Sequence, residues 1–278
     1  MTARGWMAAI VLLAAPPASA ERIVVQSTTS TAHSGLYDHV LPRFERATGI
    51  DVAVVAVGTG QAIRNARNCD GDVLIVHAEA EEEAFVAAGY GIERHDLMAN
   101  DFVLIGPAAD PAGVAGLPIA DAMTRIAEAR AVFVSRGDDS GTHRAERRLW
   151  ARAGVDAAAA SGAWYRESGS GMGATLNVAV GMDGYALTDR ATWATFANRG
   201  DHAIVVQGDP SLFNQYGIVA VSPQVCPDGN ADDAATFVEW MLGLDGQAAI
   251  GSYVVEGQVL FHPNGQADAM PMRSRPTR

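Results

Sequence analysis

The sequence contains no lysine, so all 20 of its basic residues are arginines. A Walker A phosphate loop requires a lysine and Schiff-base chemistry requires an amine, so both are excluded. The 20 arginines are outnumbered by 32 acidic residues, so the chain has a formal net charge of −12. This balance argues against nucleic acid or an anionic membrane as the main partner. An anionic ligand would therefore have to be held by local, converging donors.

Cysteine is rare too. The chain has two, Cys69 and Cys226, and their number and spacing exclude the usual cysteine metal sites. In an exported protein, a single disulfide between them is the natural prediction. A strand over 216–221 that runs antiparallel beside a strand at 72–77 would bring the two cysteines together at an edge of the sheet. Two separate buried thiols are the alternative.

No apolar run is long enough to cross a membrane. The apolar run Trp6 to Ala15 follows a single Arg4 and precedes Ala18-Ser19-Ala20, which has the small-x-small pattern of a cleavage site. Residues 1–20 therefore predict a secretion signal that is cleaved after Ala20, with an uncleaved membrane anchor as the alternative. The expected location of the mature protein is a bacterial periplasm.

Apolar strands alternate with helical patterns along the mature chain, which predicts an α/β fold. The expected strands cover 22–26, 51–57, 72–77, 101–106, 131–134, 185–187, 204–206 and 216–221. The expected helices cover 36–48, 61–68, 80–88, 119–129, 144–153, 174–181, 190–197, 234–242 and 246–253. Continuous apolar strands joined by helices indicate a parallel sheet that is covered on both faces.

The alternation restarts after Pro107 and returns late, at Tyr216, which predicts two lobes linked by two crossings. The first lobe would comprise 21–100 plus 216–278, and the inserted second lobe 101–215. Ligands of open α/β sheets bind at the carboxyl ends of strands, and the hydroxyl- and glycine-rich motifs of this chain lie at such ends.

The most informative of these motifs runs from Ser135 to His143. Arg136 precedes Ser140-Gly141-Thr142, which in turn precedes a predicted helix. The first N–H groups of a helix lack internal partners and the helix dipole is positive there. A guanidinium, two hydroxyls and free amides would thus converge on an anion. A surface ion pair with a nearby carboxylate is the alternative for Arg136.

Other hydroxyl- and glycine-rich strand ends supply further candidate donors. Ser27 to Thr31 follows the first strand, and five hydroxyl residues in a row exceed what a helix cap requires. Gly58-Thr59-Gly60 follows the second strand, where a simple tight turn is the alternative. Gly169 to Gly173 is a candidate anion nest, and Thr188-Asp189-Arg190 is either a further contact or a cap with an exposed arginine.

In the order of these motifs, the chain resembles the tungstate-binding, TupA-like periplasmic components of ABC transporters. The resemblance covers nearly all of residues 23–264. The segments that carry it are Ser27-Thr28-Thr29-Ser30-Thr31, Ser34-Gly35-Leu36, Val57 to Ala62, Asp72 to Ala78, Asn100 to Val103, Phe133 to His143, Trp164 to Glu167, Gly171 to Asn177, Leu187 to Arg190, Gly208 to Asn214 and Tyr216-Gly217. Ser27 stands where the family usually has threonine, and Cys69 and Cys226 are outside its pattern.

The resemblance implies a two-lobed type II periplasmic binding-protein fold whose lobes close on tungstate, or molybdate, and hand it to a membrane permease. The implied ligand donors are Thr29, Ser30 and Thr59 from the first lobe and Arg136, Ser140, Gly141 and Thr142 from the second. Further candidates are Thr28, Gly171, Thr188 and Arg190. The implied protein is a monomer that binds the ion through its oxygens and uses no metal, cofactor or catalytic residue.

Two other interpretations of the function remain open at this point. The loop from Arg136 to Thr142 also resembles one in phosphate-binding proteins, which carry an aspartate after the third strand to accept the proton of hydrogen phosphate. This chain has His77-Ala78 there, and a site without that acceptor suits a fully deprotonated dianion. A phosphate or sulfate receptor remains an alternative. So does a secreted hydrolase or phosphotransferase that uses Ser140 or Ser30, although no histidine lies at a recognisable triad position.

Overall fold

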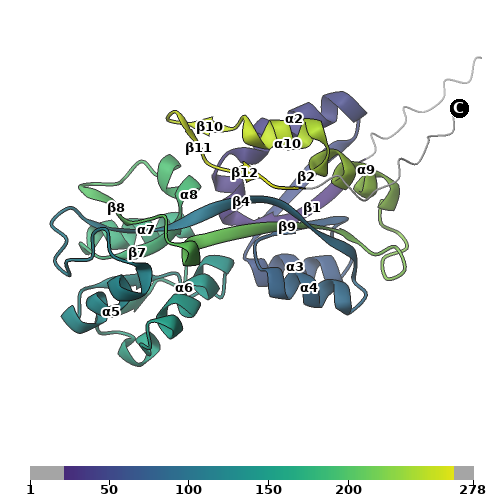
Figure 1. Ribbon diagram of the computed structural model, residues 1–278. Coiled ribbons are helices and arrows are strands. Elements are labelled where there is room, and N and C mark those ends of the chain that lie inside the picture. The colour runs from purple at the N-terminus through teal and green to yellow at the C-terminus, as the bar shows by residue number, and fades with distance from the viewer. Residues whose placement is uncertain (1–21, 266–278) are drawn as a thin grey trace, which may run out of the picture.

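The computed structural model describes residues 22–265, so the predicted signal segment lies outside the described residues. Two lobes lie side by side, and two long strands run from one to the other (Figure 1). These crossing strands are β4 (Gly91–Pro107) and β9 (Phe213–Val221). Within 22–265, no helix combines the length and the apolar character that a membrane span requires.

The first lobe is a sheet with helices on both faces. Its strand order is β12-β4-β9-β3-β1-β2. The strands besides the crossing ones are β1 (Arg22–Thr28), β2 (Asp51–Val57), β3 (Val73–Val76) and β12 (His262–Pro263), and a small hairpin adds β10 (Val254–Val255) and β11 (Gln258–Val259). The helices are α1 (Thr29–His33), α2 (Leu36–Thr48), α3 (Thr59–Arg67), α4 (Glu79–Ala87), α9 (Ala231–Leu242) and α10 (Leu244–Gly251).

The alternation of side chains along the strands gives this lobe two apolar layers. Val73 and Ile75 of β3 pack with α2, α9 and α10 on one face. Leu74 and Val76 pack with α3 and α4 on the other (Figure 1). Because successive strand residues point to opposite faces, the short apolar run of β3 serves both layers.

The second lobe is built on the C-terminal part of β4. Strands β7 (Ala186–Asp189) and β8 (His202–Val206) pair with it, and a bridge from Phe133 to Tyr185 joins the β5–β6 pair to β7. The remaining elements are β5 (Phe133–Ser135), β6 (Tyr165–Glu167), α5 (Ile119–Ala129), α6 (Gly141–Arg152), α7 (Met172–Gly181), α8 (Arg190–Thr195) and two 3₁₀ turns at Ala157–Ala160 and Pro210–Leu212. Side chains of α5 and α6 pack on one face of the sheet, and those of α7 pack on the other.

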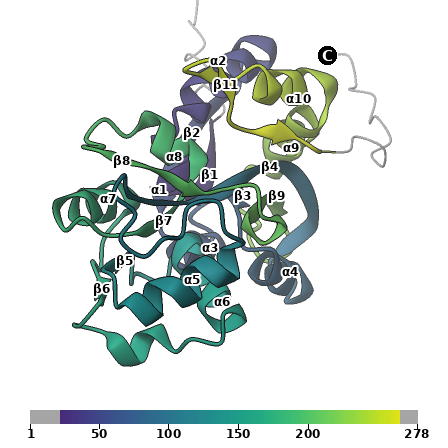
Figure 2. The same cartoon turned by 60° about the vertical axis from the view of Figure 1, so that its left-hand side comes forward.

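Helix α8 spans the boundary between the lobes. Trp193 packs in the second lobe against residues of α7. Ala191 instead belongs to the apolar layer of the first lobe. One turn of helix therefore contacts both cores, close to where α1 and α8 approach each other (Figure 2).

The crossing strands correct two sequence predictions. The strand expected at 101–106 is the second half of β4, which begins ten residues earlier, at Gly91. The first half was missed because its polar residues 93–96 read as a loop, although it pairs with β9 along most of its length. The sheet is also mixed, not parallel: β1 is parallel to β2 and β3, but β9 is antiparallel to both β3 and β4.

A short helix, α1, was also missing from the expected elements. The first strand extends to Thr28, and Thr29–His33 then turns into one helical turn. Its hydroxyl-rich sequence has weak helix propensity. The side chain of Thr28 caps it by accepting a hydrogen bond from the Thr31 amide at 3.4 Å.

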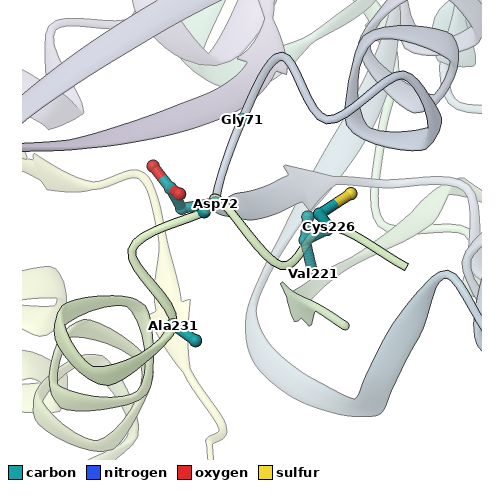
Figure 3. A pocket seen from close by; sticks show the side chains of 6 residues that line it. Gly71, Asp72, Val221, Cys226 and Ala231 are labelled. Carbon is teal, nitrogen blue, oxygen red and sulfur yellow. The ribbon is translucent and has the colours of Figure 1, made fainter. Parts of the chain in front are cut away.

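Cys69 and Cys226 form a disulfide in the first lobe, with their Cα atoms 5.4 Å apart. Cys69 follows α3, and Cys226 lies in the loop between β9 and α9. A small pocket of about 10 Å³ lies beside Cys226, with room for about one water molecule (Figure 3). The carboxylate of Asp72 at this pocket accepts hydrogen bonds from the amides of Val24 and Asn230, both at 2.8 Å. A carboxylate cannot donate a hydrogen bond to an anion, so this pocket is not a candidate anion site.

Candidate functional site

The site begins with a loop that ends at the N-terminus of α6. Ser140 caps the helix, since its hydroxyl accepts the His143 amide at 3.3 Å. The helix is fixed to the second lobe by Glu146, whose Oε1 accepts Tyr165 Oη at 2.7 Å and Trp150 Nε1 at 3.1 Å. Burial raises the pKa of Glu146 to about 7. The helix thus directs its N-terminus, the positive end of its dipole, toward the first lobe.

Arg136 lies buried beside this helix end, with 3% of its surface exposed. Its Nη2 donates to Asp138 Oδ2 at 2.6 Å, and Asp138 Oδ1 accepts the Ser140 amide at 3.2 Å. One carboxylate therefore holds the guanidinium next to the start of α6. The ion pair given as the alternative for Arg136 is therefore present, but it is buried and not on the surface. It engages Nη2 and leaves Nε without a partner within 22–265.

Two buried donors near this junction lack a partner. Within 22–265, neither Arg136 Nε nor Thr142 Oγ1 makes a hydrogen bond, and both atoms are buried. An unpaired buried donor costs about 1–3 kcal/mol, and more when it is charged. Arg94 Nη2, Arg166 Nε and His202 Nδ1 share this property elsewhere in 22–265, but only the Arg136 and Thr142 atoms lie at this helix end, where a bound ion or water would supply the missing acceptor.

The first lobe meets this helix end directly. The Gly141 amide donates to Thr59 Oγ1 at 3.1 Å, and Thr59 is fully buried at the start of α3. Nearby, Arg144 of α6 forms an ion pair with Glu81 of α4. The N-terminal ends of α3 and α6 accordingly meet at the boundary between the lobes. The chain is therefore in a closed arrangement, with predicted donors from both lobes in contact.

The hydroxyl residues that follow β1 differ in their hydrogen bonds and in their exposure. Thr28 Oγ1 lies 2.7 Å from Thr31 Oγ1 and 3.2 Å from Ser30 Oγ, so Thr28 acts mainly as a cap. Ser30 is buried and Thr29 is partly exposed. The hydrogen bonds in the described part of the chain do not connect either residue to the Arg136 loop.

The remaining candidate ligand residues differ in whether their polar groups already have hydrogen-bond partners in the chain. Arg190 binds Asp101 with two parallel hydrogen bonds, from Nε at 2.7 Å and from Nη2 at 2.6 Å, so most of its fork is occupied. Thr188 is fully buried in β7. Gly171 is an exposed cap of α7 and is not hydrogen-bonded to the Arg136 loop. The contacts thus bring together Thr59, Arg136, Ser140, Gly141 and Thr142, but not Gly171 or Arg190.

The cap predicted at Thr188-Asp189-Arg190 is confirmed, and the capping residue is the buried Asp189. Asp189 caps α8 by accepting Thr192 N at 2.8 Å and Thr192 Oγ1 at 2.6 Å. Burial raises the pKa of Asp189, while the charge of Arg136 acts in the opposite direction. Its oxygens are engaged by hydrogen-bond donors of α8, so this carboxylate is held within the helix cap.

Comparison with known proteins agrees with this geometry. A family model described as a PBP superfamily domain matches residues 15–244. The tungstate-binding protein TupA of Peptoclostridium acidaminophilum is 45% identical over 247 residues, which cover 87% of this chain and 85% of that protein. The solved structure of the tungstate-binding protein TupA from Desulfovibrio alaskensis G20 is 46% identical, with a TM-score of 0.77, and the match covers 89% of this chain and all of that one.

A second solved structure, described as the tungstate ABC transporter from Geobacter sulfurreducens, is 44% identical with a TM-score of 0.77. That match covers 84% of this chain and 99% of the other. Identity at this level over most of both chains, together with the two-lobed fold, identifies the family. The chain belongs to the PBP superfamily and, within it, to the family of the TupA proteins.

Proposed function

We propose that this chain captures tungstate, or molybdate, between its lobes and delivers the ion to the permease of an ABC transporter. The observation that carries the proposal is a pair of buried donors, Arg136 Nε and Thr142 Oγ1, that find no partner among the described residues. A tetrahedral oxyanion supplies several acceptors at once and would satisfy both. The names of the 45% and 46% identical relatives favour tungstate among such ions.

The proposed donors come from both lobes. Thr29, Ser30 and Thr59 belong to the first, and Arg136, Ser140, Gly141 and Thr142 to the second, with Thr28, Gly171, Thr188 and Arg190 as weaker candidates. We divide the lobes at 21–100 plus 216–278 and 101–215. Fixed donors on two bodies can enclose a dianion without a counter-cation, because charge-assisted hydrogen bonds replace its hydration.

The same site gives little support to a hydrolase or phosphotransferase. Ser140 Oγ accepts a backbone amide, and the adjacent His143 accepts the Asp139 amide on Nδ1 at 3.0 Å. Ser30 Oγ contacts Thr28 Oγ1. Within 22–265, neither hydroxyl is hydrogen-bonded to a side chain that could take its proton, which nucleophilic catalysis requires. We therefore propose a monomeric, exported, non-enzymatic receptor whose signal is cleaved after Ala20.

Titration calorimetry tests this function. Tungstate is expected to bind one ion per chain, and molybdate to compete with it. Phosphate and sulfate are expected to displace tungstate only at far higher concentration, because a donor cage leaves the O–H of hydrogen phosphate unmatched and is spaced for a larger tetrahedron than sulfate. Displacement by phosphate or sulfate at comparable concentration would contradict the assignment, as would hydrolysis of phosphomonoesters by the pure protein.

A further inference from the structure

His77 lies where the two lobes meet, in contact with both crossing strands. It follows β3 directly and is buried, with 6% of its surface exposed. Its ring stacks on Tyr216 of β9, with centroids 4.9 Å apart, and tilts against Phe102 of β4 at 6.2 Å. An imidazole in this setting has little freedom to move.

A chain of hydrogen bonds fixes the ring further. Asn100 and Asn214 lie opposite each other on the two crossing strands, and Asn214 Nδ2 donates to Asn100 Oδ1 at 2.7 Å. The Oδ1 atom of Asn214 is then the acceptor that faces His77 Nδ1, 3.0 Å away. His77 Nδ1 accordingly carries the hydrogen, and the ring is held to the strands that connect the lobes.

The ring is also uncharged at neutral pH. Burial lowers the pKa of His77 to about 4, and the charges of Arg136 and Arg148 lower it as well, although the hydrogen bond that the ring donates to Asn214 acts in the opposite direction. His77 therefore adds no positive charge to the site. Its contribution has to come from its shape and rigidity.

The edge of this ring touches the second lobe at Gly141. A Cβ atom on Gly141 would lie 2.6 Å from His77 Cε1 and 3.0 Å from Nε2, well inside contact distance. Gly141 is the first residue of α6, and its φ is not in the positive range that would require glycine. The close approach of His77 is thus the reason why this position cannot carry a side chain.

We infer that His77 determines the size of the oxyanion that the site accepts, by acting as the rigid stop against which Gly141 of the second lobe closes. The inference rests on the oxyanion function proposed above. Gly141 lies between Ser140 and Thr142. The distance at which Gly141 meets His77 therefore sets how near the donors at the start of α6 come to the donors of the first lobe. A shorter residue at 77 would let the lobes close further, around a smaller tetrahedron.

Two single substitutions and the double variant that combines them test whether His77 limits the closure of the lobes. His77→Ala is expected to lower the ratio of tungstate affinity to sulfate affinity by about tenfold, while tungstate still binds. Gly141→Ala is expected to weaken binding of both ions by about ten- to a hundredfold, because the new Cβ meets the ring before the lobes close. In the double variant the alanine occupies space vacated by the imidazole, so tungstate affinity should recover most of the loss seen in Gly141→Ala.

The control is Gly181→Ala, at the last residue of α7 in the same lobe, where a Cβ would meet no atom within 4 Å. It is expected to leave both affinities unchanged. Calorimetry with tungstate and sulfate gives the affinities, and thermal unfolding shows that each variant is folded. If His77→Ala does not fold, His77→Asn takes its place, since asparagine is shorter and can still reach Asn214.

The outcomes separate the two proposals. Failure of the wild-type protein to bind tungstate would overturn the function itself. Binding by the wild type with an unchanged tungstate-to-sulfate ratio in the His77 variant would overturn only the role of His77. So would a double variant that binds no better than Gly141→Ala.

Discussion

Replacement of Arg136 by alanine is expected to weaken tungstate binding by about ten- to a hundredfold. The guanidinium is buried, and its Nε has no partner within 22–265, so the ion would be its acceptor. A buried hydrogen bond between charged groups contributes about 1.5–3 kcal/mol, which gives this range of affinity. Loss of a single hydroxyl, as in Thr142→Ala, should cost less, because a neutral hydrogen bond contributes about 0.5–1.5 kcal/mol.

The matched control is Arg147→Ala, which removes the same charge from an exposed position on α6. It separates the local hydrogen bond from the change in net charge and should have little effect on calorimetric affinity. Thermal unfolding shows whether each variant is folded at the temperature of the titration. Wild-type affinity in a folded Arg136→Ala protein would remove Arg136 from the site.

Loss of the disulfide is expected to lower the free energy of unfolding by about 4–5 kcal/mol. Cys69 and Cys226 are 157 positions apart, and a cross-link that closes so long a loop restricts the unfolded chain strongly. Urea unfolding of the Cys69→Ser/Cys226→Ser variant measures the change, and the wild type in reductant should approach the same value.

Tungstate affinity provides the specificity control for this variant. The disulfide joins the loop after α3 to the loop before α9, whereas the candidate site lies at the other end of α3, at Thr59. Affinity measured well below the unfolding transition should therefore be retained. Two free thiols in denatured, non-reduced wild-type protein would contradict the disulfide.

Local patterns predicted many elements of this fold. Helices α2 and α5 begin and end where their apolar spacing and terminal glycine or loop residues indicated. The loop from Arg136 to Thr142 was identified because its residue types have a mechanism, an arginine and hydroxyls before a helix. What failed was the first half of β4, since its consecutive polar residues 93–96 show no apolar alternation, although they lie beside β9.

Long-range contacts account for the rest. The sequence placed His77 directly after the third strand, where phosphate-binding proteins carry an aspartate. It gave no sign that Asn214, 137 positions away, would fix its ring, or that Gly141 would touch it. Likewise, nothing in Thr188-Asp189-Arg190 indicated that Asp101 would occupy the arginine. Such roles depend on which strands lie together, and that is decided by the packing of both lobes.

The position of the bound ion is the most direct test of the central claim, that a buried cage between the lobes binds the oxyanion through Arg136 and Thr142. Tungsten scatters anomalously, so diffraction from crystals grown with tungstate locates it without reference to the chain. One tungsten is expected within about 4–5 Å of both Arg136 Nε and Thr142 Oγ1, the span of a metal–oxygen bond plus a hydrogen bond. A single tungsten bound elsewhere, with both donors still unpaired, would contradict the account.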